Sequence, residues 1–171
     1  GLPRSRAPRH VLLSHHRGHV LFFLLYFLTA QLKIVDLTGK TSNIKTPGII
    51  RSFEYSPDGS YILFETIKKP YSYLVPAHLF PYTVEVLNPA GKFVKKICDV
   101  PLADNIPTGF DAVIKGPREF GWRADKPATL FWVEAQDKGN PNVQARLRDI
   151  IYIQNAPFNK NKIILTECYL R

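Results

Sequence analysis

The chain has 171 residues, of which 45% are hydrophobic, and a formal net charge of +9. A hydrophobic fraction of this size predicts one folded domain or a piece of a larger one, and it argues against a disordered chain. Four of the positive charges, on Arg4, Arg6, Arg9 and Arg17, lie before residue 20. The later basic residues form pairs near strand ends rather than a stripe between aromatic residues, so we expect no nucleic-acid partner.

Residues 1–28 form an N-terminal segment that is first basic and then apolar. The basic part, GLPRSRAPRHVLLSHHRGH (1–19), leads into VLFFLLYFL (20–28), and the small residue Ala30 follows. This order is that of a secretory signal, although Leu28 is bulky for a cleavage site; a buried strand or helix, or sequence foreign to the fold, are the alternatives. The apolar run is far shorter than the ~20 residues of a membrane-spanning helix, so we expect no transmembrane span.

Four histidines in this segment are the only candidates for a metal cluster: His10, His15, His16 and His19. His15 and His19 would share one face of a helix. No carboxylate or cysteine lies close to them in the sequence, so a solvated arm of histidine and arginine is the better interpretation. We expect neither a metal nor another cofactor.

Strand, turn and strand recur three times with the same shape. QLKIVDLTGKTSNI (31–44) and TVEVLNPAGKFVKKI (83–97) carry Gly-Lys in equivalent turns, and RDIIYIQNAPFNKNKIIL (148–165) repeats the shape with a longer turn. A second kind of hairpin alternates with these: IIRSFEYSPDGSYILFETI (49–67) and REFGWRADKPATLFWVEA (118–135). Such internal repetition indicates an array of similar structural units.

The order of these hairpins predicts an all-β fold of antiparallel four-stranded blades, in an incomplete β-propeller of about two and a half blades. The expected parts are a partial blade at 29–48, one blade at 49–100 and one at 101–171. An immunoglobulin-like sandwich also has short alternating strands, but sandwiches rarely show internal duplication.

The stretch SPDG (56–59) is a turn rather than a nucleophile site. Its proline presets φ, Asp58 can bond to its own backbone, and Gly59 accepts a positive φ. No serine of the chain is flanked by glycines in the G-x-S-x-G pattern of a nucleophile elbow. We therefore expect no catalytic residue in this chain.

Cys98 and Cys168 are the only cysteines, and each lies in a run typical of a strand. No CxxC or Cys/His spacing accompanies them, so we expect two free, buried thiols. Methionine is absent, even at position 1, which indicates a fragment or a processed chain.

Three segments resemble the N-terminal propeller of the prolyl oligopeptidase family of serine peptidases, in particular its glutamyl endopeptidase-like subgroup. They are SPDGSYILFETIKKPYSYLVPAHLFPYTVEV (56–86), PLADNIPTGFDAVIKGPREFGWRADKPATLFWVEAQD (101–137) and RDIIYIQNAPF (148–158). The resemblance implies a larger parent enzyme in which an α/β-hydrolase domain carries a Ser, Asp, His triad. Nothing in this chain matches that domain, so we expect the chain alone to be inactive.

In this family the propeller covers the active site and limits access to peptides, so the resemblance implies two partners, the catalytic domain of the same parent chain and peptide substrates. The insertion KKPYSYLVPAHLFPY (68–82) carries Tyr71, Tyr73, Phe80 and Tyr82 among three prolines. Aromatic residues stiffened by proline suit an interface or a substrate-facing lip. The alternative is a loop that packs its aromatic residues onto its own blade.

Arg118 and Arg123, on either side of Trp122, are the other site candidates, because a guanidinium binds a carboxylate in a fork and would suit an acidic substrate side chain. Strand alternation favours a structural role for them, since Phe120 and Trp122 share one face while Arg123 lies beside a turn.

The sequence therefore predicts a propeller portion that gates and shapes access to a serine peptidase. A free-standing propeller that binds proteins in the bacterial cell envelope is the alternative. The compartment is periplasmic or secreted if residues 1–28 are a signal, and otherwise cytoplasmic or plastid stroma. Two and a half blades leave apolar faces uncovered, so we expect the piece to be marginally stable and to self-associate.

Overall fold

The computed structural model describes residues 26–171, and most of the N-terminal segment, with its four histidines, lies outside that range. Residues 26–28 are helical, and the described residues after them form nine strands and one short 3₁₀ helix. These elements are β1 (Thr29–Val35), β2 (Thr41–Tyr55), β3 (Ile62–Ile67), η1 (Ala77–Leu79), β4 (Tyr82–Leu87), β5 (Phe93–Val100), β6 (Pro117–Trp122), β7 (Thr129–Ala135), β8 (Asp149–Asn155) and β9 (Ile163–Cys168).

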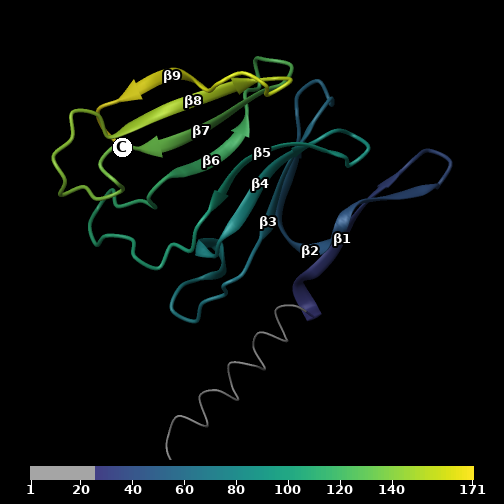
Figure 1. Cartoon of the computed structure of the whole chain (residues 1–171), viewed down its shortest axis with the longest axis horizontal. Coiled ribbons are helices and arrows are strands. Elements are labelled where there is room, and N and C mark those ends of the chain that lie inside the picture. Colours follow the sequence, from purple (N-terminus) through teal and green to yellow (C-terminus); the bar gives the residue numbers. More distant parts are fainter. Residues whose placement is uncertain (1–25) are drawn as a thin grey trace, which may run out of the picture.

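The strands form two antiparallel sheets, each a run of consecutive strands (Figure 1). Sheet A has the order β1-β2-β3-β4-β5 and sheet B the order β6-β7-β8-β9. The predicted all-β, antiparallel fold and its five hairpins are thereby confirmed. In an immunoglobulin-like sandwich the chain passes between the sheets from strand to strand, and here it leaves sheet A only once.

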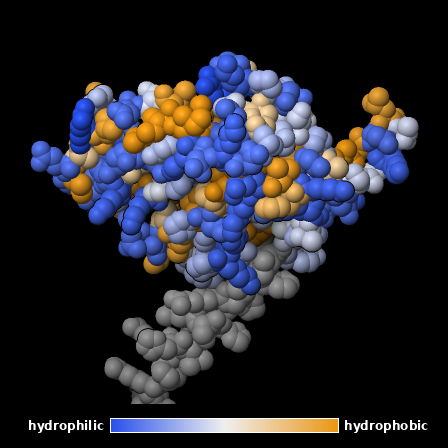
Figure 2. Space-filling view, turned by 45° about the horizontal axis from the view of Figure 1, so that its top comes forward, coloured by the Kyte–Doolittle hydropathy of each residue, from blue (hydrophilic) through white to orange (hydrophobic). Residues whose placement is uncertain are grey.

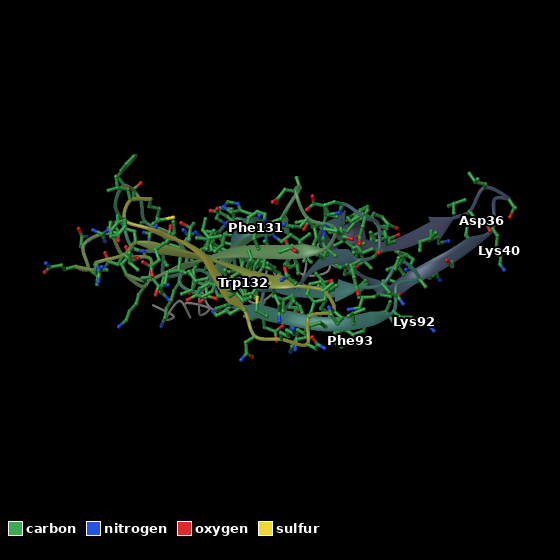
Figure 3. The ribbon with its side chains drawn as sticks, turned by 90° about the horizontal axis from the view of Figure 1, so that it is seen from above. Asp36, Lys40, Lys92, Phe93, Phe131 and Trp132 are labelled. Atoms are coloured by element: carbon green, nitrogen blue, oxygen red, sulfur yellow. The ribbon has the colours of Figure 1, made fainter. Side chains whose placement is uncertain are left out.

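Strand β2 is long because it pairs with two different neighbours in succession. Its first part, residues 41–49, pairs with β1, and its second part, residues 49–55, pairs with β3. The expected boundary between residues 48 and 49 therefore lies inside β2, where the pairing passes from one neighbour to the other. The β1–β2 hairpin projects beyond the rest of sheet A, with Asp36 and Lys40 at its tip (Figure 3).

The projecting hairpin folds over one face of sheet A and buries apolar side chains there. The buried residues of this cluster are Ile44, Ile62, Phe64 and Leu87, with Leu32, Ile34 and Ile50 packed at its border. An ion pair between Lys45 of β2 and Glu85 of β4 joins the same two layers. The hairpin end of sheet A thus forms a further layer over the β3–β4 part of the same sheet.

The opposite face of sheet A packs against sheet B. Side chains alternate along β3, so neighbouring residues pack on opposite faces of the sheet. Phe64 packs against the hairpin and Leu63 against sheet B. The buried residues between the sheets are Leu63, Tyr82, Val84, Val86 and Val100 from sheet A and Trp122, Leu130, Trp132 and Phe158 from sheet B and its β8–β9 turn. Hairpin, sheet A and sheet B therefore follow one another as three successive layers.

The SPDG turn has the predicted conformation. Gly59 has φ +70°, and the amide of Ser60 donates to the carboxylate of Asp58 at 3.0 Å. The Ser56 hydroxyl donates to Asp58 at 2.7 Å and accepts from the amide of Tyr61 at 3.0 Å. It therefore both donates and accepts a hydrogen bond within the turn. The amide of Asp58 also donates to the carbonyl of Pro127 at 3.1 Å, which joins the equivalent turns of the two sheets.

Successive connections alternate between the two ends of the strands, because neighbouring strands run antiparallel. One end, here called the turn end, carries the connections 56–61, 88–92, 123–128 and 156–162. The other, here called the loop end, carries the longer connections 68–81, 101–116 and 136–148. The amide of Val113 donates to the carbonyl of Gly139 at 3.1 Å, so two of these longer connections are in contact.

Cys98 and Cys168 are free and only half-buried, which corrects the expectation of fully buried thiols. Burial raises the pKa of Cys98 to about 12, so this thiol stays protonated at neutral pH. Residues 26–171 contain no helix that is long and apolar enough to cross a membrane.

The contact between the hairpin and the β4–β5 turn gives a stability prediction. Gly91 has φ +76°, and a Cβ there would lie 3.0 Å from Cα, Cγ1 and Cγ2 of Ile44, whereas a Cβ at Gly59 would meet nothing within 4 Å. We expect Gly59→Ala to lower the free energy of unfolding by about 1 kcal/mol through its positive φ alone. Gly91→Ala should lower it by about 3 kcal/mol, because crowding adds to the same strain.

Urea unfolding of both variants measures the difference. Equal losses in the two variants would show that the hairpin does not pack on sheet A as described.

Candidate functional site

The loop end holds a cavity of about 550 Å³ between the two sheets. It is bounded by β2, η1, the connection 101–116 and the start of β6. Its charged wall residues are Arg51, Glu65, Arg118 and Glu119, and His78 lies among them. Its apolar wall includes Leu79, Phe80, Tyr82, Val100, Ile114 and Phe120. The cavity is therefore mostly apolar with a few charged groups, which is typical of ligand sites.

A bulge in β6 directs Arg118. Arg118 lies opposite Val133 and Gly121 lies opposite Phe131, so β6 has one extra residue between these two pairs. Glu119, inside the bulge, has φ 55°. The extra residue turns Arg118 away from the face of the β6 aromatic residues, where simple alternation would have placed it.

The Arg118 side chain is only 9% exposed, and only part of its guanidinium is hydrogen-bonded. Its Nη2 donates to Oδ2 of Asp149 at 2.6 Å. Nε lies 3.5 Å from Oε1 of Glu119, a side chain that is 70% exposed. Nε and Nη1 have no hydrogen-bond partner within residues 26–171. Buried donors without partners are rare in folded proteins and mark a strained or functional position.

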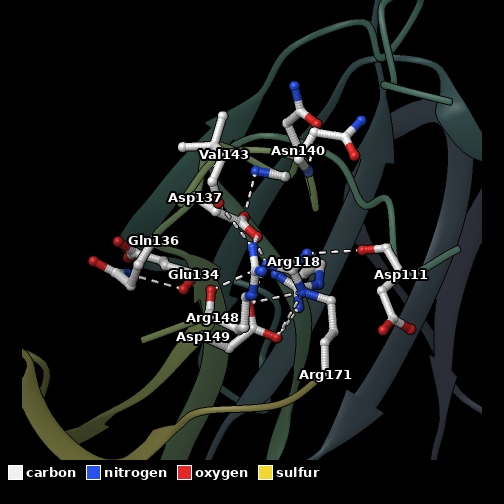
Figure 4. Close-up of polar contacts among 12 residues, drawn as sticks. Asp111, Arg118, Glu134, Gln136, Asp137, Asn140, Val143, Arg148, Asp149 and Arg171 are labelled. Carbon is white, nitrogen blue, oxygen red and sulfur yellow. Dashed lines mark hydrogen bonds and ion pairs between the residues drawn. The ribbon is translucent and has the colours of Figure 1, made fainter. Parts of the chain in front are cut away.

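Arg118 belongs to a network of buried charges at the end of sheet B (Figure 4). Arg171 donates to Asp149 at 3.1 Å and to Asp137 at 2.7 Å, and Arg148 donates to Asp137 at 3.0 Å. Burial by itself would raise the pKa of Asp137, but the hydrogen bonds from Arg171 and Arg148 outweigh it and lower that pKa. The network holds β8, the connection 136–148 and the chain after β9 together.

Across the cavity, Arg51 is already paired. Its Nη1 donates to Oε2 of Glu65 at 3.1 Å, and its guanidinium lies over the Tyr82 ring, 4.0 Å from the centroid. Burial raises the pKa of Tyr82, and the neighbouring charge of Arg51 opposes that shift in part. The positive charge of Arg51 is therefore balanced within the wall of the cavity.

The structure brings two of the five candidate site residues to this cavity, Phe80 and Arg118. Tyr71 is adjacent, with its ring centroid 5.7 Å from that of Phe80. Tyr73 does not line the cavity and is 55% exposed. Arg123 lies in the 123–128 connection at the turn end, where it forms a fork with Asp125 through bonds of 2.9 and 2.6 Å.

The sequence did not identify the partners of Arg118. Asp149 lies 31 residues further along the chain. Asp137, Arg148 and Arg171 lie at the ends of strands and loops, where charged residues are common and carry no special signal.

Two arrangements typical of catalysis were sought around the cavity. No hydrogen bond within residues 26–171 joins His78 to a serine hydroxyl or a cysteine thiol. The described part of the chain has no group of three or more His, Cys, Asp or Glu residues with metal-site geometry.

The chain is similar to part of two plant proteins. It is 43% identical over 135 residues, or 78% of this chain, to a protein of Oryza sativa subsp. japonica named "Probable glutamyl endopeptidase, chloroplastic". It is 41% identical over 131 residues, or 77% of this chain, to an Arabidopsis thaliana protein of the same name. The chain spans 14% of the length of each relative. No protein-family model and no solved structure matches the chain.

The Asp137 carboxylate gives a prediction for stability and pH. Asp137 is fully buried, and Asp137→Asn removes the charge that pairs with Arg148 and Arg171, so we expect a loss of about 3 kcal/mol in the free energy of unfolding at pH 7. Because the pKa of Asp137 is lowered in the folded chain, its stabilisation is complete above its unfolded pKa of about 4 and is lost as the pH falls through its folded pKa.

Urea unfolding from pH 7 down to pH 2 measures both effects, and Asp137→Asn should show the weaker dependence on pH. The exposed Asp104→Asn is the control and should change stability by less than about 0.5 kcal/mol. A wild-type pH profile that Asp137→Asn does not alter would contradict the assignment.

Proposed function

We propose that this chain is the non-catalytic propeller portion of a prolyl oligopeptidase-type serine peptidase, of the glutamyl endopeptidase-like kind. In this proposal it shapes the access of peptides to an α/β-hydrolase domain carried by the same parent chain. The observation that carries the proposal is the identity of 43% over 78% of the chain to a protein named as a probable glutamyl endopeptidase. It favours a peptidase portion over a free-standing binding module.

The layered architecture supports a propeller. Blades of a propeller are meanders of four consecutive strands that pack face to face around an axis. Sheet B is such a meander, and in sheet A the second part of β2 with β3, β4 and β5 is another. The β1–β2 hairpin takes the place of a third unit on the outer face of sheet A.

The loop end supports a role in peptide access. It gathers the longer connections of both sheets, and loops of this kind carry function in many folds while the sheets position them. The connection 68–81 packs Phe80 into the cavity wall and leaves Tyr73 exposed. We propose that this connection forms a lip over which peptides pass, and that the loop end faces the catalytic domain.

The access role is tested in a chimera of the rice relative in which this chain replaces the matching segment. We expect the chimera to hydrolyse a short glutamyl peptide, and the 171-residue chain alone to hydrolyse none. Shortening the connection 68–81 should raise hydrolysis of a long peptide relative to the short one by about tenfold, because the lip limits entry.

Shortening the β4–β5 turn at residues 88–92, at the turn end, is the matched control and should leave the ratio of long to short peptide unchanged. If both deletions change the ratio equally, the access role is wrong. Hydrolysis by the chain alone would also overturn the proposal.

We also propose that the isolated chain self-associates through the edge of sheet B. Strand β9 exposes three consecutive apolar side chains: Ile163 is 55%, Ile164 50% and Leu165 44% exposed. Figure 2 shows apolar side chains grouped among hydrophilic ones at its upper left. An exposed apolar edge strand is a template for pairing with another chain.

Sedimentation velocity over a range of concentrations measures this association. Ile163→Lys combined with Ile164→Lys should shift the chain towards monomer, because charge on an edge strand opposes pairing. Leu37→Lys, at the fully exposed tip of the β1–β2 hairpin, should not. A wild-type chain that stays monomeric at every concentration would contradict the proposal.

A further inference from the structure

A second cavity, of about 420 Å³, lies beside the cavity of about 550 Å³ at the loop end. The larger one is here called the loop-end cavity and the smaller one the inner cavity. The inner cavity is enclosed by residues 100–107, residues 114–117 and Lys138. The residues that line both cavities are Val100, Pro101, Ala103, Ile106 and Ile114. Residues 101–107, here called the strap, therefore form most of the partition between the two cavities.

The strap makes few contacts that would hold it in place. None of its residues is fully buried. Its one backbone hydrogen bond within residues 26–171 joins the amide of Ala103 to the carbonyl of Leu79 at 3.0 Å. The side-chain amide of Asn105 donates to Asp104 at 2.9 Å, a bond that stays inside the strap. Segments with few buried contacts and few hydrogen bonds open at a low cost in free energy.

The chain on either side of the strap is held more firmly. Val100, at the end of β5, is only 3% exposed. Beyond the strap, the carbonyl of Asp111 accepts from Nη1 of Arg171 at 2.8 Å, and the amide of Val113 donates to Gly139 at 3.1 Å. The chain is thus fixed before and after the strap, and the strap itself depends on a single bond.

That bond also sets the direction in which the strap can move. Leu79 lies in the wall of the loop-end cavity and does not line the inner cavity. Breaking the bond between Ala103 and Leu79 therefore frees the strap to move away from the loop-end cavity. The inner cavity supplies the space for this movement, and its apolar wall at Ile114 and Pro117 can receive an apolar side chain of the strap such as Leu102.

We infer that the strap is a gate of the loop-end cavity and opens by moving into the inner cavity. In the closed state the strap is bonded to η1 and bounds the loop-end cavity. In the open state it fills the inner cavity, and the loop-end cavity is wider and more accessible to solvent. The inference does not depend on the proposed function, because it concerns the movement of the chain and not the molecule that enters.

Hydrogen exchange of the wild-type chain tests whether the strap opens. The amide of Ala103 exchanges when its bond to Leu79 breaks. After correction for intrinsic rates, we expect it to exchange at least about tenfold faster than the amides that pair β3 with β4, and without dependence on dilute urea. The amide of Val113 should exchange more slowly than that of Ala103. An Ala103 amide that exchanges as slowly as those of β3 and β4 overturns the inference.

Lys115→Trp tests the direction of the movement. Lys115 is exposed and lines the inner cavity but not the loop-end cavity, so an indole there occupies the space that the strap needs. We expect the exchange of the Ala103 amide to slow by about tenfold. Lys126→Trp, exposed at the turn end, is the matched control and should leave the rate unchanged. An unchanged rate in Lys115→Trp, with circular dichroism showing that the variant is folded, overturns the inference.

Thiol labelling measures whether the movement opens the loop-end cavity. Val100 lines both cavities, whereas Val84 is buried between the sheets and lines neither. In a chain with Cys98→Ala and Cys168→Ala, we expect Val100→Cys to react at least about tenfold faster than Val84→Cys. Adding Lys115→Trp should remove most of this difference. Equal labelling rates of the two cysteines without Lys115→Trp would show that the strap does not expose the cavity.

Discussion

Burial of β3 and β4, the middle strands of sheet A, on both of their faces is the constraint on which the rest of this structure depends. Leu63 and Val84 face sheet B, while Ile62 and Phe64 face the β1–β2 hairpin, and all four are almost completely buried. A sheet whose strands are apolar on both faces is stable only between two further layers. The hairpin, the middle of sheet A and sheet B therefore have to stack in sequence.

The buried charges at the loop end are a consequence of that arrangement. The bulge of β6 turns Arg118 towards Asp149, and Arg148 and Arg171 complete a network that ties β8 to the connection 136–148. Removing one member of such a network is costly, because its charged partners are then left buried and unpaired. The pairing is complete for the two aspartates and incomplete for Arg118, and the incomplete pairing lies in the wall of the cavity.

The two ends of the strands thus have different roles. Short turns with local side-chain bonds, such as that of Ser56 with Asp58, close the turn end. At the loop end, apolar walls and a partly satisfied guanidinium surround a space of about 550 Å³.

The sequence by itself determined the all-β class, the five hairpins and the SPDG turn, because strand alternation and turn residues act over a few neighbouring positions. It also placed Phe80 and Arg118 among the site candidates from local composition. Tertiary structure decided that Phe80 and Arg118 share a cavity while Arg123 lies at the opposite end, and that Asp149 is the partner of Arg118. The one-residue bulge in β6 reverses the direction of a side chain, and no periodic pattern reveals where a strand departs from its period.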